Sequence, residues 1–187
     1  MNSFRKLRIG LWGLLLAGAS LGLTSCFDDA DSVPEQYREW RQQNMDYVTA
    51  AEAKTDADGK PYYTKITPTW APDGYVLVHW HNDRSLTAGN LSPMDNSTVQ
   101  MKYQLFDIND KEISNSYSNT DSVYSSRPLQ NIIGMQVAMT HMHVGDSVTM
   151  VIPYQSGYGE KVHSDIPPYS TLIYNVKMKA ITAYEVP

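Results

Sequence analysis

Tyr158 is the residue whose position most clearly indicates a chemical role. It stands beside Gly159, just after a strand-like segment that ends at Pro153, and so falls outside the alternation of that strand. A tyrosine placed in this way has less reason to pack in a core, and its hydroxyl can donate or accept a hydrogen bond. The sequence therefore marks Tyr158 as a candidate for contact with a ligand.

Four of the five histidines form two His-x-His pairs, His79 with His81 and His141 with His143. Residues i and i+2 of a strand face the same side, so each pair could contribute two ligands to Zn²⁺ or Cu²⁺. The alternative is that they are polar, partly exposed histidines at a rim. We favour the alternative and predict neither a metal site nor a cofactor.

The N-terminal residues carry a targeting pattern. Arg5, Lys6 and Arg8 precede an apolar run that is short for a transmembrane helix. The sequence Leu-Thr-Ser before Cys26 resembles the lipobox of bacterial lipoprotein precursors. Because Cys26 is the chain's single cysteine, we favour lipidation over an ordinary signal peptide with an incidental cysteine.

This interpretation predicts a lipoprotein signal peptide at 1–25 and a lipid anchor on Cys26 in a bacterial membrane, the outer membrane. The acidic residues at 28, 29 and 31 fit either a surface-export signal or a solvated tether, so the face of the membrane stays open. Residues 26–187 hold 12 basic against 20 acidic residues, a net charge of −8, with no basic patch. We therefore expect no nucleic-acid partner.

A helix is predicted from Val33 to Ala53. Pro34 suits a first helical turn, the segment holds no glycine, and four residues recur at helical spacing: Tyr37, Trp40, Tyr47 and Ala51. Such a stripe favours docking on the helix's own domain over a dimer seam, and both remain open.

From residue 62 onward, short strands are predicted. Alternating apolar residues mark 98–106, 146–153 and 170–178, while 62–70 and 74–83 alternate or run apolar. Residues 128–146 can make one short helix, with Met135, Met139 and Met142 at helical spacing and a turn at Gly145. Antiparallel strands with one internal helix predict an α+β half-barrel.

The order of these motifs resembles the FKBP-type peptidyl-prolyl isomerases. The matching motifs, in chain order, are Ile132-Ile133-Gly134-Met135, Met142-x-Val144-Gly145-Asp146, Ile152-Pro153, Tyr158-Gly159, Ile166-Pro167-Pro168 and Ser170-Thr171-Leu172-Ile173-Tyr174. The resemblance covers 97–184 well and implies an FKBP-like antiparallel half-barrel sheet wrapped around one short helix. It divides the chain into a signal peptide at 1–25, a lipid-anchored tether and helix at 26–61, and an isomerase domain at 62–187.

The resemblance also implies a role for named residues. Tyr158 would donate its hydroxyl to a substrate carbonyl, and the backbone amide of Ile132 could hydrogen-bond the substrate. Tyr103 and Tyr174 would be aromatic walls, and Met135 the pocket floor. The remaining implied substrate-binding residues are Ile113, a wall, and Ile166 and His163, which would overhang the rim.

Two positions depart from the family pattern. Met135 stands where FKBP-type enzymes usually carry tryptophan, and Ile113-Ser114 aligns with their Phe-Asp pair, so the carboxylate is lost. No clear counterpart exists for a second phenylalanine, for which Tyr124 is a doubtful substitute. These changes predict isomerase activity that is weakened or lost.

The function implied is rotation of Xaa–Pro bonds in exported, proline-containing polypeptides. The alternative is a catalytically weak or inactive binding module on the same scaffold, which Ser114 and Met135 favour. A third hypothesis, a structural or carbohydrate-contacting surface protein, is suggested by Trp70, Trp80 and the many tyrosines.

Overall fold

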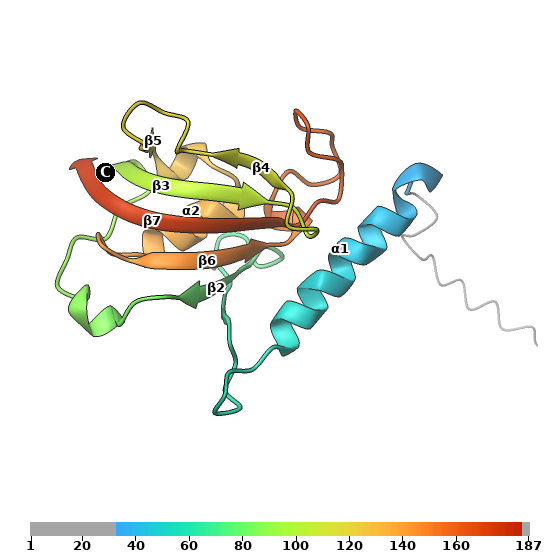
Figure 1. Ribbon diagram of the computed structural model, residues 1–187, viewed down its shortest axis with the longest axis horizontal. Coiled ribbons are helices and arrows are strands. Elements are labelled where there is room, and N and C mark those ends of the chain that lie inside the picture. Colours follow the sequence, from blue (N-terminus) through green and yellow to red (C-terminus); the bar gives the residue numbers. More distant parts are fainter. Residues whose placement is uncertain (1–32, 185–187) are drawn as a thin grey trace, which may run out of the picture. The chain divides into compact units, whose positions relative to one another are not determined.

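The computed structural model describes residues 33–184, and these residues build a seven-stranded antiparallel sheet (Figure 1). The strands run in the order β1 (Thr64–Ile66), β2 (Val76–Trp80), β6 (Ser147–Ile152), β7 (Leu172–Ala183), β3 (Thr98–Phe106) and β4 (Glu112–Asn115). A further strand, β5 (Tyr124–Ser126), also pairs with β3. The long central strands β3 and β7 pair along nearly their whole length.

One face of the sheet packs on helix α2 (Ile133–His141), as Figure 1 shows behind the strands. Strand alternation turns one set of side chains toward this helix, and these are almost fully buried. They include Val148, Met150 and Ile152 of β6. Gly134 lets α2 approach closely, because a Cβ there would lie 2.4 Å from Cγ2 of Ile152.

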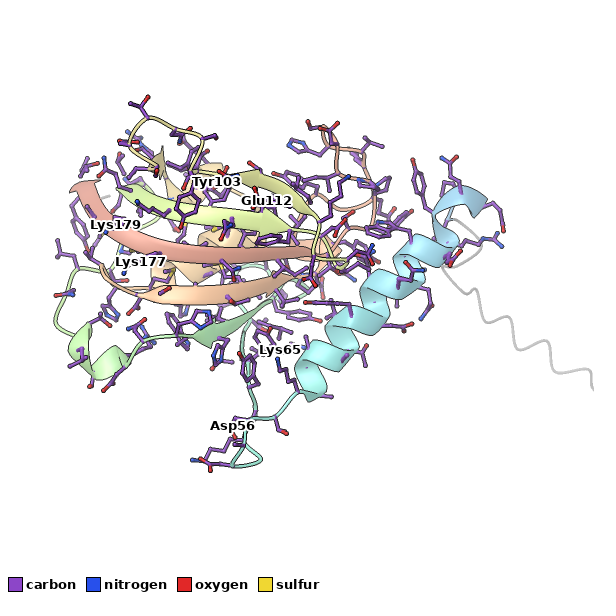
Figure 2. All side chains as sticks on the ribbon, in the orientation of Figure 1. Asp56, Lys65, Tyr103, Glu112, Lys177 and Lys179 are labelled. Carbon is purple, nitrogen blue, oxygen red and sulfur yellow. The ribbon has the colours of Figure 1, made fainter. Side chains whose placement is uncertain are left out.

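Helix α1 (Glu35–Ala53) packs on the opposite face at one end of the sheet. Its residues Val48 and Ala51 meet Leu77 of β2 and Val151 of β6, whose strand neighbours face α2. Beside the C-terminal end of α1, Lys65 of β1 forms a 2.8 Å ion pair with Glu52 (Figure 2). The helix therefore docks on its own domain, as the sequence favoured.

The N-terminal boundary of α1 differs from the prediction. Pro34 is the N-cap with an extended ψ of 135°, so the helix begins at Glu35 rather than Val33. Val33 is 4% exposed and packs with Tyr154 and Tyr169, so it belongs to the folded domain. The buried residues of α1 are Asn44, Val48 and Ala51. The aromatic residues of the predicted stripe are only half-buried and lie at the margins of this face.

The predicted strands at 98–106, 146–153 and 170–178 are confirmed as β3, β6 and β7. The strand predicted at 62–70 shrinks to the three residues of β1, and β5 was not predicted. Helix α2 ends at His141, because Met142 already has an extended backbone. Short 3₁₀ turns occupy Arg84–Leu86, Pro128–Gln130 and Tyr154–Ser156.

The buried carboxylate of Asp146 stabilises the turn after α2. The Asp146 side chain is 0% exposed and accepts hydrogen bonds from the Thr87 hydroxyl (2.5 Å), the Asn82 amide (3.0 Å) and the His143 backbone N–H (2.8 Å). Arg84 lies 3.6 Å away and balances its charge. Gly145 takes a φ of +101° here, a conformation that glycine adopts without strain.

Within residues 33–184, no helix is long and apolar enough to cross a membrane. The predicted signal peptide and the lipidation site Cys26 lie outside the described residues.

Candidate functional site

A pocket of about 340 Å³ opens between the α2-facing side of the sheet, the start of α2 and the loop that joins β6 to β7. Strands β3, β4, β5 and β7 supply one side, and the β6–β7 loop (residues 153–171) supplies the other. The lining residues are Met101, Tyr103, Leu105, Ile113, Ser114, Tyr124, Asn131, Met135, Tyr158, His163, Ser164, Asp165, Ile166 and Tyr174.

Two tyrosines from neighbouring strands form the sheet side of the pocket. Tyr103 of β3, labelled in Figure 2, and Tyr174 of β7 have ring centroids 5.9 Å apart. The Tyr103 hydroxyl lies 3.0 Å from the Ser114 hydroxyl of β4. Ser114 therefore holds the phenol of Tyr103 in place.

Tyr124 adds a third aromatic ring at the mouth of the pocket. Its ring meets that of Tyr103 edge to face, with centroids 5.5 Å apart, and 40% of the residue is exposed. It reaches this place because β5 pairs with β3, with Tyr124 opposite Met101. Tyr124 is thus a pocket residue, as the sequence only doubtfully suggested.

The floor of the pocket comes from the first turn of α2. Met135 is 4% exposed and lines the pocket from below. Ile132 is the N-cap of this helix, and its N–H finds no hydrogen-bond acceptor among residues 33–184. The first amides of a helix have no partner within it, so this N–H remains available to a ligand.

The β6–β7 loop brings Tyr158 and a tight hairpin to the pocket. His163 and Ile166 pair by two backbone hydrogen bonds of 3.0 and 2.9 Å, which place Ser164 and Asp165 at the tip. The His163 ring stacks on Tyr158 with centroids 3.8 Å apart. Ile166 is 4% exposed and is part of the wall rather than an overhanging rim.

The two phenols nearest the pocket centre keep their protons at neutral pH. Burial raises the pKa of the Tyr158 hydroxyl, and the nearby Tyr103 and Tyr124 raise it further, while a hydrogen bond with Tyr174 acts in the opposite direction. Burial also raises the pKa of Tyr174 far above its ordinary value. Both hydroxyls are therefore hydrogen-bond donors under ordinary conditions.

Asp165 is the one acidic residue among the lining residues. Its carboxylate is exposed at the hairpin tip and has no ion-pair partner within residues 33–184. The other lining residues are aromatic, aliphatic and small polar groups, and no lysine or arginine is among them.

The structure brings together seven of the eight pocket residues predicted from sequence. The eighth, Ile132, packs against the core cluster beside the lining residues Asn131 and Met135. Sequence reasoning missed Met101 and Leu105, although they share the face of Tyr103 in the alternation of β3. It also missed Asn131, Ser164 and Asp165, which lie in irregular segments that leave no periodic signal.

The rings of His79 and His81 lie edge to face with centroids 5.0 Å apart, but a nitrogen of each ring is already bonded to a protein group. His79 stacks on Tyr62 and bonds the Tyr62 carbonyl, while His81 bonds the Thr149 hydroxyl. His141 bonds the Val137 carbonyl within α2. In the part of the chain that the structure describes, no group of three or more histidine, cysteine or acidic residues is placed to hold a metal ion.

Comparison with known proteins links this pocket to one family. The sequence model of the FKBP-type peptidyl-prolyl cis-trans isomerases matches residues 89–179. FkpA, an FKBP-type isomerase of Escherichia coli strain K12, is 32% identical over 88 residues, which cover 46% of this chain and 32% of FkpA. FkpA of Escherichia coli O157:H7 matches equally. The chain thus matches about a third of the length of these curated relatives.

Solved structures share the fold. A peptidyl-prolyl isomerase from Pseudomonas syringae pv. tomato aligns with a TM-score of 0.62 and 18% identity, covering 78% of this chain and 95% of that one. FkpA from Escherichia coli aligns with a TM-score of 0.57 and 22% identity, covering 84% and 62%. The sequence match assigns residues 89–179 of this chain to the FKBP-type peptidyl-prolyl cis-trans isomerase family, and the α+β half-barrel agrees with the fold of these solved structures.

Proposed function

We propose that the chain catalyses cis–trans isomerisation of Xaa–Pro bonds in the pocket around Tyr158. The observation that carries this proposal is the position of Tyr158, whose protonated hydroxyl stands over an apolar floor made by Met135. Four tyrosines and the aliphatic residues Ile113 and Ile166 surround the same space, which suits a proline ring.

The reaction makes and breaks no covalent bond. Rotation about a peptide bond has a barrier of about 18–20 kcal/mol, because twisting breaks the resonance of the amide. The Xaa–Pro isomers are nearly balanced, so the enzyme need only bind the twisted amide more tightly than either planar form. Each 1.36 kcal/mol of such preference gives about tenfold in rate.

The pocket offers two hydrogen-bond donors for a twisted substrate. The Tyr158 hydroxyl lines the pocket, and the Ile132 N–H, which has no acceptor among residues 33–184, belongs to the N-cap three residues before Met135. These two groups can hold substrate carbonyls while the proline ring sits on Met135. Where the aromatic and aliphatic lining residues displace water from the bound amide, they penalise its more polar planar form. We propose Tyr158, Ile132 and Tyr103 as the catalytic residues. The proposed substrate contacts are Met135, Ile113, Ile166, Tyr174 and His163.

The activity is proposed to be modest. Met135 is flexible and leaves a less defined floor than tryptophan would. The serine at 114 bonds to Tyr103 and offers no carboxylate to the substrate. Met135 and Ser114 also support a second candidate function, a module that binds proline-containing chains without isomerising their Xaa–Pro bonds.

The test is cis-to-trans relaxation of Xaa-Pro tetrapeptides with leucine or phenylalanine before the proline. We expect acceleration above the uncatalysed rate and a clear loss of that acceleration in Tyr158→Phe, with unchanged thermal unfolding. Binding of the peptides without acceleration would select the second candidate. Equal turnover in Tyr158→Phe would remove its hydroxyl from the mechanism.

We further propose that the mature protein is anchored by lipid on Cys26 to the bacterial outer membrane and assists the folding of exported polypeptides. The support is the basic–apolar–Cys26 pattern of the sequence, and several buried acyl chains would give firm anchoring. Mass spectrometry of the protein extracted from membranes should find acyl mass on the peptide that begins at Cys26. A Cys26→Ser variant released to the soluble fraction would agree, and an unmodified Cys26 would contradict it.

A further inference from the structure

Helix α1 lies outside the segment that matches the family, yet it contacts both ends of the loop that builds half of the pocket. The β6–β7 loop contributes Tyr158 and the hairpin that carries His163, Asp165 and Ile166. These residues lie outside the helices and strands, so the contacts at the two ends of the loop add to the hairpin's own backbone bonds in placing them.

The far end of the loop is bonded to Asn44, which is 0% exposed. The Asn44 side-chain oxygen accepts the Thr171 backbone N–H at 2.6 Å, and its backbone carbonyl accepts the Thr171 hydroxyl at 3.3 Å. The amide nitrogen of Asn44 donates to the Trp40 carbonyl at 2.7 Å, which fixes the orientation of the side chain. Thr171 directly precedes β7, so α1 sets where the loop joins the sheet.

A second bond runs from the helix into the loop. The Trp40 indole N–H donates to the Ser170 hydroxyl at 3.1 Å, and Ser170 in turn donates to the Pro167 carbonyl at 2.8 Å. Pro167 follows Ile166 of the pocket wall. Two hydrogen bonds thus connect the Trp40 indole, through Ser170, to Pro167, which is next to Ile166 of the pocket wall.

The near end of the loop is held by aromatic packing. Tyr154 packs edge to face on Tyr169, with centroids 5.4 Å apart, and Tyr37 of α1 covers the pair. The backbones of Tyr154 and Tyr169 also both bond to Gly159. The Gly159 N–H donates to the Tyr154 carbonyl, and the Tyr169 N–H donates to the Gly159 carbonyl, both at 2.9 Å. Gly159 is the neighbour of Tyr158.

We infer that α1 is a positioning element of the isomerase site, and that Asn44 and Trp40 are its positioning residues. Both ends of the loop are tied to one rigid helix, so the loop holds Tyr158 and the hairpin against the sheet. Misplacement by about 1 Å of groups that must meet a substrate can cost on the order of 100-fold in rate. The activity readout of this inference rests on the proposed function.

The experiment compares three variants of the full chain. Asn44→Ala removes the bonds from the Asn44 side chain, and Trp40→Phe removes one bond while keeping an aromatic ring. The matched control is Ala51→Gly, which destabilises α1 through helix propensity where it packs on Leu77 and Val151, away from the loop. Thermal unfolding, amide hydrogen exchange and tetrapeptide turnover are measured for each.

We expect Asn44→Ala to speed amide exchange throughout 154–171 and to lower kcat/KM about tenfold, with Trp40→Phe showing a smaller loss of about threefold. Ala51→Gly should leave loop exchange and turnover within twofold of wild type at a comparable loss of thermal stability. Turnover that follows thermal stability equally in all variants, or unchanged loop exchange in Asn44→Ala and Trp40→Phe, would overturn the inference. If the wild-type chain shows no turnover, the proposed function fails, and loop exchange alone still decides whether α1 holds the loop.

Discussion

The rings of Tyr158 and His163 stack face to face, with centroids 3.8 Å apart and planes inclined by 8°. Tyr158 lies at the start of the loop segment that enters the pocket, and His163 lies in the hairpin that closes it. Because the hairpin is fixed by its own backbone bonds, the imidazole is a platform that limits the orientations open to the Tyr158 ring. The direction in which the Tyr158 hydroxyl points therefore depends on His163, which does not itself need to donate a hydrogen bond.

Removing this platform should lower turnover through Tyr158. Aromatic pairs contribute about 0.5–1.5 kcal/mol beyond their buried area, so His163→Ala is expected to reduce kcat/KM by about two- to tenfold. His163→Phe keeps an aromatic face and should stay within about twofold of wild type in the same peptide assay. A large loss in both variants would show that the imidazole acts through its nitrogens instead.

Asp165 should give the pocket a preference for cationic substrates. An exposed charge pair contributes about 0.2–1 kcal/mol, so a peptide with lysine before proline should be turned over up to about fivefold faster than one with glutamate. The preference should fall with added salt and vanish in Asp165→Asn. Glu160→Gln is the control, because Glu160 lies on the same loop but does not line the pocket. A preference that survives in Asp165→Asn would assign it elsewhere.

Asp146 should make stability depend on acid pH. Burial raises the pKa of this carboxyl, but hydrogen bonds from Thr87, His143 and Asn82 and the charge of Arg84 more than offset that effect, so its pKa lies below the ordinary value of 3.8. A carboxyl with a lowered pKa stabilises the fold above its unfolded-state pKa, and this contribution is lost as pH falls through its folded-state pKa.

Asp146→Asn should therefore lower the free energy of unfolding near pH 7 by about 1.5–3 kcal/mol, the usual range for hydrogen bonds to a charged group. The difference from wild type should shrink below about pH 4, near the ordinary pKa of aspartate. Urea unfolding at pH 7 and pH 3 measures it. A difference that is constant across this range would mean that the carboxylate charge is not what stabilises the turn.

Gly134 should tolerate no side chain. A Cβ at this position would lie 2.4 Å from Ile152, so Gly134→Ala is expected to cost about 1–3 kcal/mol by overpacking, despite the better helix propensity of alanine. Gly89→Ala is the matched control, because a Cβ there meets no atom within 4 Å, and it should change stability by no more than about 0.5 kcal/mol. Equal unfolding midpoints for the two variants would contradict the close approach of α2 and β6.

The parts of the fold that the sequence predicted well are those with a repeating burial pattern. In β7, Leu172, Tyr174, Val176 and Met178 alternate with exposed residues, and all four are buried as expected. The strand β5 has three residues and no such alternation, and its pairing with β3 depends on a loop whose course no local pattern encodes. That is why Tyr124 could be placed in the pocket only from the structure.

The site was predictable where a motif fixes its neighbours in space. The Tyr158-Gly159 and Ile166-Pro167-Pro168 motifs led to pocket residues because both lie in the β6–β7 loop, which forms one side of the pocket. The role of Asn44 could not be predicted, because its bonds to Thr171 join residues 127 positions apart. A buried asparagine within a helix also gives no signal in the apolar periodicity.

The central claim is that the pocket around Tyr158 rotates Xaa–Pro bonds. Exchange spectroscopy by nuclear magnetic resonance tests it most directly, on a Leu-Pro peptide at equilibrium with a small amount of protein that carries isotope-labelled methionine and tyrosine. We predict cross-peaks between the cis and trans peptide signals that vanish in Tyr158→Phe, together with shifts of the Met135, Tyr103 and Tyr158 resonances. Shifts at these residues without exchange cross-peaks, or cross-peaks with shifts confined to other residues, would contradict the claim.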